Sequence, residues 1–186
     1  MSGYLCFQVE ANRLKPVLLD HLLEHRLNSC HPVHSDVSGR EEDMVTRTKV
    51  LFLCVGNACR SQMAEAVARH TAADVIEPSS AGLVAFGEIA GPTISVLNEH
   101  GISVDGQTSK SLRSEDLSAA DLIINMTGRS GAEIFTGPTP PFEDWDVGDP
   151  YGFNLAVYRG IRDQIEQRID ELARRLRGKA DSPETS

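Results

Sequence analysis

The sequence predicts an α/β fold, a three-layer sandwich in which a four-stranded parallel sheet is flanked by helices. Three observations support this prediction. Short apolar runs alternate along the chain with segments of helical character. The first run, residues 50–55, is almost entirely apolar, as in a strand that is buried on both faces. The last segment, residues 155–177, repeats its apolar side chains every three or four positions, which predicts a helix with one buried stripe.

The chain after the first strand supplies the next three elements in order. Residues 61–71 contain methionine and several alanines, which favour a helix. Residues 74–81 are expected to form the second strand. Residues 92–100 place apolar side chains at helical spacing, and Gly101 stands where such a helix would end.

Two further strands complete the predicted sheet. The apolar run at residues 121–126 predicts the third strand, and a short fourth strand is expected at residues 144–147. The last helix follows, and its carboxyl end carries several arginines, the favourable cations at that end of the helix dipole. Residues 178–186 are expected to be a flexible tail.

The first 47 residues differ from the rest and are expected to form an N-terminal extension that is poorly ordered or a mis-called start. They contain one leucine-rich amphipathic stretch, followed by a polar segment of linker composition. Because the regular pattern begins only after Met44, we interpret Met44 as the biological start. An intact mass that matches all 186 residues of the natively expressed protein would contradict this interpretation.

The composition limits the classes of function. A chain of 186 residues and 20.3 kDa is long enough for one domain of ordinary size. Its net charge of −9 argues against nucleic acid or an anionic membrane as the main partner. No apolar run approaches the ~20 residues of a membrane span, and the first ten residues lack a secretory signal. Four cysteines are too few for a disulfide scaffold, so we expect a reducing, cytoplasmic location.

The segment between the first strand and the next helix carries the chemistry, and we call residues 54–61 the anion loop. It consists of Cys54, Val55, Gly56, Asn57, Ala58, Cys59, Arg60 and Ser61. Gly56 and Asn57 tolerate unusual backbone angles, so the loop can turn successive N–H groups inward. With the N-terminus of a helix behind it, such a loop forms a cradle for an anion.

Cys54 is the candidate nucleophile of this loop. The helix dipole, the inward amides and the charge of Arg60 all favour its thiolate form. The planar guanidinium of Arg60 can bind two oxygens of a tetrahedral oxyanion. Ser61 can donate a hydrogen bond to the sulfur, and Asn57 can fix the shape of the loop. Alternatively, Cys54 is a buried core cysteine and Arg60 a surface cap, but the order of strand, glycine, asparagine and helix favours the functional interpretation.

The anion loop and its flanks resemble the phosphate-binding loop of low-molecular-weight protein tyrosine phosphatases and the related arsenate reductases. The resemblance continues at residues 80–82, 97–102, 121–126 and 149–152, and it spans about residues 48–177. It leaves out the N-terminal extension. The resemblance therefore implies one catalytic domain over residues 48–177 with the low-molecular-weight phosphatase fold.

The resemblance implies a two-step reaction without metal or cofactor. Cys54 attacks phosphorus and forms a phosphocysteine, while Arg60 and the loop amides hold the oxygens. Asp149 protonates the leaving oxygen and then activates the water that hydrolyses the intermediate. Tyr151 is expected to wall the pocket. Alone, Asp149 and the proline after it would predict only a turn; their place before the last helix, as in the family, assigns the acid.

Phosphotyrosine hydrolysis is the preferred function, with a phosphorylated protein or a small phosphomonoester as substrate. Phosphate, sulfate and arsenate are expected to bind in the loop. An arsenate reductase that uses an external thiol is the alternative, because Gln62 and residues 106–112 resemble the reductases. No cysteine follows Cys59, so the downstream cysteine pair of the thioredoxin-coupled reductases is absent from the sequence. A non-catalytic oxyanion-binding module is the third hypothesis.

Two residues of the anion loop have open interpretations. The resemblance implies that Cys59 closes a reversible disulfide with Cys54, whereas its small apolar side chain equally suits packing. Ala58 stands where the tyrosine phosphatases commonly have isoleucine, so the floor of the pocket is expected to be wider. The protein-arginine phosphatases have threonine at this position, which argues against arginine specificity.

Overall fold

The computed structural model describes residues 47–180, and its centre is a sheet of four parallel strands in the order β2-β1-β3-β4. The strands are β1 (Thr48–Cys54), β2 (Ile76–Gly82), β3 (Leu122–Asn125) and β4 (Phe142–Asp144). The helices are α1 (Arg60–Thr71), α2 (Gly91–Asn98), α3 (Ser114–Ala119), α4 (Gly131–Ile134) and α5 (Leu155–Ala180). The predicted α/β sandwich is confirmed. Residues 1–46 of the predicted extension and residues 181–186 of the predicted tail lie outside the described residues.

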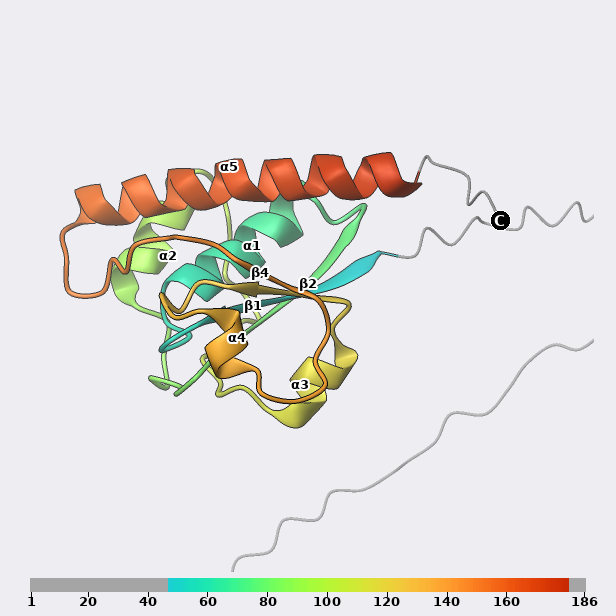
Figure 1. Ribbon diagram of the computed structural model, residues 1–186. Helices are drawn as coiled ribbons and strands as arrows, with labels where there is room; N and C mark the ends of the chain where they lie inside the picture. Colours follow the sequence, from blue (N-terminus) through green and yellow to red (C-terminus); the bar gives the residue numbers. More distant parts are fainter. Residues whose placement is uncertain (1–46, 181–186) are drawn as a thin grey trace, which may run out of the picture. The chain divides into compact units, whose positions relative to one another are not determined.

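The sheet lies between two layers of helices (Figure 1). The helices α1, α2 and α5 cover one face, and α3 and α4 lie on the other. The side chains of β1 alternate between the two layers, as the pleat of a strand requires. Val50 and Phe52 join the large core beneath α1 and α5, whereas Leu51 and Leu53 join a smaller core that Leu117 of α3 completes. All four strand residues are fully buried, so the prediction of a strand covered on both faces is confirmed.

The long helix α5 packs on the sheet through the predicted apolar stripe, in which Ile165, Ile169 and Leu172 are buried. It continues to Ala180, three residues beyond its predicted end. The last turn is fixed by Arg177, whose guanidinium donates two hydrogen bonds of 2.7 and 2.8 Å to the carboxylate of Asp74. No described helix is long and apolar enough to cross a membrane.

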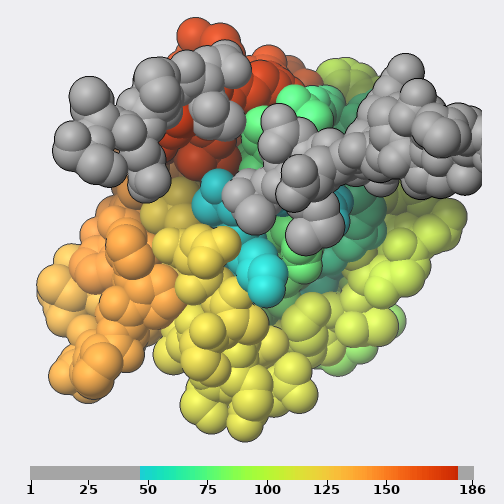
Figure 2. Space-filling view, turned by 90° about the vertical axis from the view of Figure 1, so that its right-hand side faces the viewer, coloured from blue at the N-terminus to red at the C-terminus, as the bar shows by residue number. Residues whose placement is uncertain are grey.

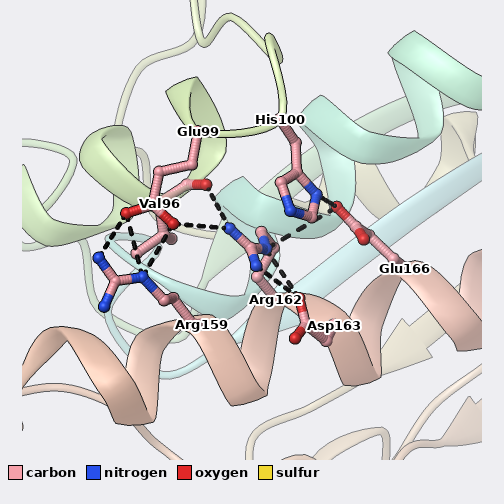
Figure 3. A network of polar contacts seen from close by, with 7 residues as sticks. All are labelled: Val96, Glu99, His100, Arg159, Arg162, Asp163 and Glu166. Atoms are coloured by element: carbon pink, nitrogen blue, oxygen red, sulfur yellow. Dashed lines mark hydrogen bonds and ion pairs between the residues drawn. The ribbon is translucent and has the colours of Figure 1, made fainter.

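Charged side chains join α5 to the end of α2 (Figure 3). Arg162 is buried, and its guanidinium donates to the carbonyl of Val96 at 2.8 Å and to Glu99 at 3.1 Å. Arg159 donates further hydrogen bonds to the same Glu99 carboxylate. The two arginines hold the pKa of Glu99 far below its usual range, at about 2.

The fourth strand differs from its predicted position. It covers residues 142–144, whereas residues 144–147 were predicted. Trp145 and Val147 are buried as a strand pattern requires, but they lie in an irregular segment that packs into the core below α5. The helices α3 and α4 were not predicted, because they are short and bury little apolar surface.

The topology places the anion loop at the carboxyl end of the sheet. The strand β1 lies between β2 and β3, so the connections that leave these central strands diverge. A crevice forms at such a switch point beyond the carboxyl ends of the strands, where α/β proteins bind ligands. Figure 2 shows the opposite end of the sheet, where the start of β1 (cyan) lies between residues of α3 (yellow) and α5 (red).

Candidate active site

The backbone of the anion loop directs its N–H groups inward, because its carbonyl groups are bonded on the outside. Backbone N–H groups donate to these carbonyls as follows: Leu83 to Cys54, Val84 to Val55, Phe86 to Gly56 and Ala90 to Ala58, each at 3.0 Å. The carbonyl of Asn57 accepts from the side chain of Gln62 at 3.2 Å. In a planar trans peptide the N–H points opposite to the C=O. The N–H groups of residues 55–59 therefore face the interior of the loop, and they donate to no other residue in the described part of the chain.

Asn57 fixes the shape of the loop. Its φ of 47° lies in the left-handed region, which asparagine tolerates better than most residues. The side-chain amide donates to Ser61 Oγ at 2.8 Å and to Ser80 Oγ at 2.9 Å. The Oδ1 atom accepts from the backbone N–H of Lys110 at 2.8 Å and from Gln62 at 3.0 Å. Four hydrogen bonds thus hold the loop between α1, β2 and the segment before α3.

Cys54 is the last residue of β1, and only 2% of its surface is exposed. Its sulfur lies 3.0 Å from Ser61 Oγ. Because this hydroxyl already accepts a hydrogen bond from Asn57, its own hydrogen is available for the sulfur. A hydroxyl that donates to sulfur stabilises the thiolate more than the thiol. Ser61 therefore has the position that the sequence predicts for a donor to Cys54.

Arg60 begins α1 and is almost completely buried. One terminal nitrogen donates to the carbonyl of Met126 at 2.7 Å, and the other forms an ion pair with the carboxylate of Asp149. The Nε atom is buried and has no hydrogen-bond partner. A buried charged donor without a partner is costly, so an anion that brings an oxygen to Nε would be bound favourably.

Asp149 joins the site from the loop between β4 and α5. One carboxylate oxygen pairs with Arg60, and the other accepts the backbone N–H of Tyr151 at 3.1 Å. About half of the Asp149 side chain (49%) is exposed, so its carboxylate can contact both Arg60 and a molecule that enters from solvent.

The predicted site residues gather around one small pocket, which we call the loop pocket. Its lining consists of Cys54, Gly56, Ala58, Cys59, Arg60, Phe86, Asp149 and Tyr151. Three predicted residues do not line it: Asn57 and Ser61 are buried behind the loop, and Val55 is exposed at 36%. Among the described residues, no group of three or more histidine, cysteine or acidic side chains is arranged to hold a metal ion.

Phe86 is the wall residue that the sequence did not predict. Its ring lies edge-on to that of Tyr151, with 5.2 Å between the ring centres. It also packs on Gly56, where an added Cβ would lie 2.7 Å from the ring, so a larger residue at this position would displace Phe86. Phe86 follows β2 in an irregular loop without periodicity. The available signal was an aromatic residue beside a glycine, at the carboxyl end of a strand next to β1.

Cys59 is buried beneath the loop pocket, with its sulfur 3.5 Å from the hydroxyl of Tyr158. Burial raises the pKa of the Cys59 thiol. Both Cys54 and Cys59 are free thiols in this structure, and the apolar surroundings of Cys59 agree with the packing interpretation. The disulfide stays a prediction.

Comparisons with known proteins agree on one family. The family model described as "Low molecular weight phosphotyrosine protein phosphatase" matches residues 49–182. A glutaredoxin arsenate reductase of Synechocystis is 34% identical over 135 residues, which are 69% of this chain and 98% of that protein.

Solved structures give the same picture. The YwlE arginine phosphatase from Geobacillus stearothermophilus superposes with a TM-score of 0.62 at 31% identity, covering 71% of this chain and 94% of that one. A low molecular weight protein tyrosine phosphatase from T. tengcongensis gives 0.63 at 33% identity, with 69% and 99% coverage. Proteins named as phosphatases and proteins named as arsenate reductases therefore both match about 70% of this chain.

Proposed function

Because the chain belongs to the low molecular weight phosphotyrosine protein phosphatase family, we propose that it hydrolyses phosphomonoesters, with phosphotyrosine in proteins as the substrate class. The observation that carries the proposal is the unpartnered, buried Nε of Arg60 beside a loop whose N–H groups face inward. These donors suit the equatorial oxygens of a phosphoryl group, with Cys54 at the base of the same pocket.

In the first step, the sulfur of Cys54 attacks phosphorus and the bond from phosphorus to the leaving oxygen breaks. The loop amides and Arg60 hold the three equatorial oxygens, whose charge is spread in the transition state. The proton for the leaving oxygen comes from Asp149, which lines the same pocket. The products of this step are an alcohol or phenol and a phosphocysteine.

In the second step, Asp149 is a carboxylate again and accepts a proton from a water molecule. The oxygen of that water attacks phosphorus, the S–P bond breaks, and Cys54 leaves as a thiolate. Inorganic phosphate is the product. The hydroxyl of Ser61, 3.0 Å from the sulfur, stabilises the thiolate both as nucleophile and as leaving group.

The cysteine content supports hydrolysis over reduction. An arsenate reductase must break a bond between cysteine and arsenic with a reducing thiol. The chain has no cysteine after Cys59, and Cys59 itself is buried against Tyr158. Hydrolysis instead uses water as the attacking molecule and needs no reducing thiol. The second support is the carboxylate of Asp149, which lines the same pocket, is half-exposed, and can accept a proton from water.

Arsenate reduction with an external thiol is the second candidate. The relatives named arsenate reductase favour it, at 34% identity over almost their whole length. So does Gln62, a reductase-like residue, which donates to the carbonyl of Thr108 at 3.0 Å and accepts from Gln107 at 2.7 Å. These bonds tie the first turn of α1, directly after the anion loop, to the reductase-like segment at residues 106–112.

One comparison separates the two candidates. Wild type and Cys54→Ser are assayed for hydrolysis of p-nitrophenyl phosphate and for arsenate reduction with glutathione or mycothiol. The proposal predicts hydrolysis by the wild type only. Strong arsenate reduction with negligible ester hydrolysis would reverse the ranking, and neither activity would favour an oxyanion-binding module.

A further inference from the structure

A second pocket adjoins the loop pocket and has a volume of about 420 Å³. The two pockets share three wall residues, Ala58, Phe86 and Tyr151. A molecule whose phosphoryl group lies in the anion loop therefore has this second space directly beside it. Its volume is within the range of about 300–1,000 Å³ that is typical of ligand sites. We call it the side pocket.

Aromatic rings dominate the walls of the side pocket. Phe86, Tyr151 and Phe153 are exposed at 49%, 56% and 63%, and Tyr158 forms a buried wall. Because these rings are largely exposed, a molecule that enters the side pocket can contact them directly. Faces of aromatic rings attract cations through their quadrupole.

Glu88 is the one charged residue that lines the side pocket. It is exposed, and it forms no hydrogen bond or ion pair with any other described residue. Asp149, the acidic residue that lines the loop pocket, is in contrast paired with Arg60. A free carboxylate among aromatic rings has the chemistry of a site for an ammonium or guanidinium group.

We propose that the side pocket binds a lysine or arginine side chain that lies within two residues of the phosphorylated residue, and that Glu88 determines this preference. This inference rests on the proposed function, since it names the class of protein that the same site accepts. Long-range attraction acts in the same direction, because the whole chain has a net charge of −9.

The geometry favours a neighbouring side chain over phosphotyrosine itself as the occupant of the side pocket. With its phosphoryl group in the anion loop, phosphotyrosine would place its ring where the two pockets meet, between the shared walls. Side chains two residues apart in an extended segment point to the same side, about 7 Å from each other. A flexible lysine or arginine within this distance can extend its charged end into the side pocket and cover the rings with its methylene groups.

Binding of two phosphotyrosine peptides to Cys54→Ser tests the proposal without turnover. The peptides differ only at the positions two residues before and two residues after phosphotyrosine, which are lysine and arginine in one and glutamate in the other. We expect the basic peptide to bind about 5- to 10-fold more tightly by fluorescence anisotropy at low salt, the combined effect of one exposed ion pair and one cation–π contact.

The same measurement on two further variants assigns the preference. Adding Glu88→Gln, which keeps the shape but removes the charge, should lower the preference to about 2- to 3-fold, because the ion pair is lost and the cation–π contact remains. The matched control Glu115→Gln, an exposed glutamate of α3, should keep the full preference.

Three outcomes would overturn the proposal: equal affinities in the parent protein, a preference that Glu88→Gln leaves undiminished, or no binding of either peptide. If a concentration-dependent dimer covered the side pocket and neither peptide bound, the proposal would likewise be overturned. The proposed function fails separately, when the wild type hydrolyses no phosphomonoester although Cys54→Ser still discriminates between the peptides.

Discussion

One buried nitrogen, Nε of Arg60, is the strongest single indication that the loop pocket binds an anion. The remaining nitrogens of this guanidinium are bound to Met126 and Asp149, so the fork is held in place before any ligand arrives. A donor fixed in this way needs no reorganisation when charge develops on a phosphoryl oxygen. The ion pair with Asp149 also means that the carboxylate and an incoming anion share the same guanidinium.

Arg60→Lys should weaken phosphate binding by about 10- to 100-fold, because the ammonium group keeps the charge but loses hydrogen bonds of the planar fork. Isothermal titration with inorganic phosphate measures this directly. Arg113→Lys, at the exposed residue that precedes α3, is the matched control and should bind like the wild type. Equal affinity in Arg60→Lys would remove Arg60 from the anion site.

Asp149→Ala should lower kcat by about 10²–10⁴-fold for phenyl phosphate, whose poor leaving group needs a proton. The loss should be smaller for p-nitrophenyl phosphate, since p-nitrophenolate leaves without one. Asp146→Ala removes an exposed carboxylate from the same loop and is the control. If phenyl phosphate were hydrolysed by Asp149→Ala at the wild-type rate, Asp149 would not be the acid.

The sequence predicts the reacting groups better than it predicts the walls around them. Cys54 and Arg60 lie within one short loop whose strand and helix have clear patterns, and Asp149 precedes a long periodic helix. Phe86 and Glu88 lie in an irregular loop, where no periodicity fixes which side chains face the pocket. Their positions depend on backbone hydrogen bonds such as that from Phe86 to Gly56, which only the fold reveals.

The helix α5 is attached to α2 by charge as well as by apolar packing. Glu99 accepts from both Arg159 and Arg162, and the buried Arg162 also binds the end of α2 through Val96 (Figure 3). The arginines lower the pKa of Glu99 from 4.5 to about 2. A carboxylate whose pKa is lower in the folded state stabilises the fold above its ordinary pKa and loses this effect as the pH falls towards 2.

Glu99→Gln should therefore lower the melting temperature at pH 7, and the difference from the wild type should shrink between pH 5 and pH 2. Thermal unfolding followed by circular dichroism at several pH values checks this. Glu115→Gln, on α3, should match the wild type throughout. A difference that stays constant down to pH 2 would mean that the charge of Glu99 is not its cause.

Element boundaries show where sequence patterns reach their limit. The strand β1 and the helix α5 have long apolar patterns, and their positions agree with the prediction to within a few residues. The strand β4 has three residues, and the buried Trp145 and Val147 after it imitate a strand pattern. Tertiary packing of an irregular segment produces this burial, so local periodicity could not distinguish the two.

The order of the strands in the sheet determines where the candidate active site lies. Placing β1 between β2 and β3 opens a crevice at the carboxyl end of the sheet, and the anion loop occupies it. The loop from β2 supplies Phe86, and the loop before α5 supplies Asp149 and Tyr151. Residues from three distant parts of the chain therefore meet around Cys54.

Trapping the covalent intermediate shows whether Cys54 is the nucleophile of the hydrolysis. Asp149→Ala is mixed with p-nitrophenyl phosphate, quenched within the first turnover and digested for mass spectrometry. Hydrolysis through the anion loop predicts one phosphoryl group on the peptide that contains Cys54, formed with a burst of p-nitrophenol. Release of p-nitrophenol with no phosphoryl group on Cys54 would contradict it.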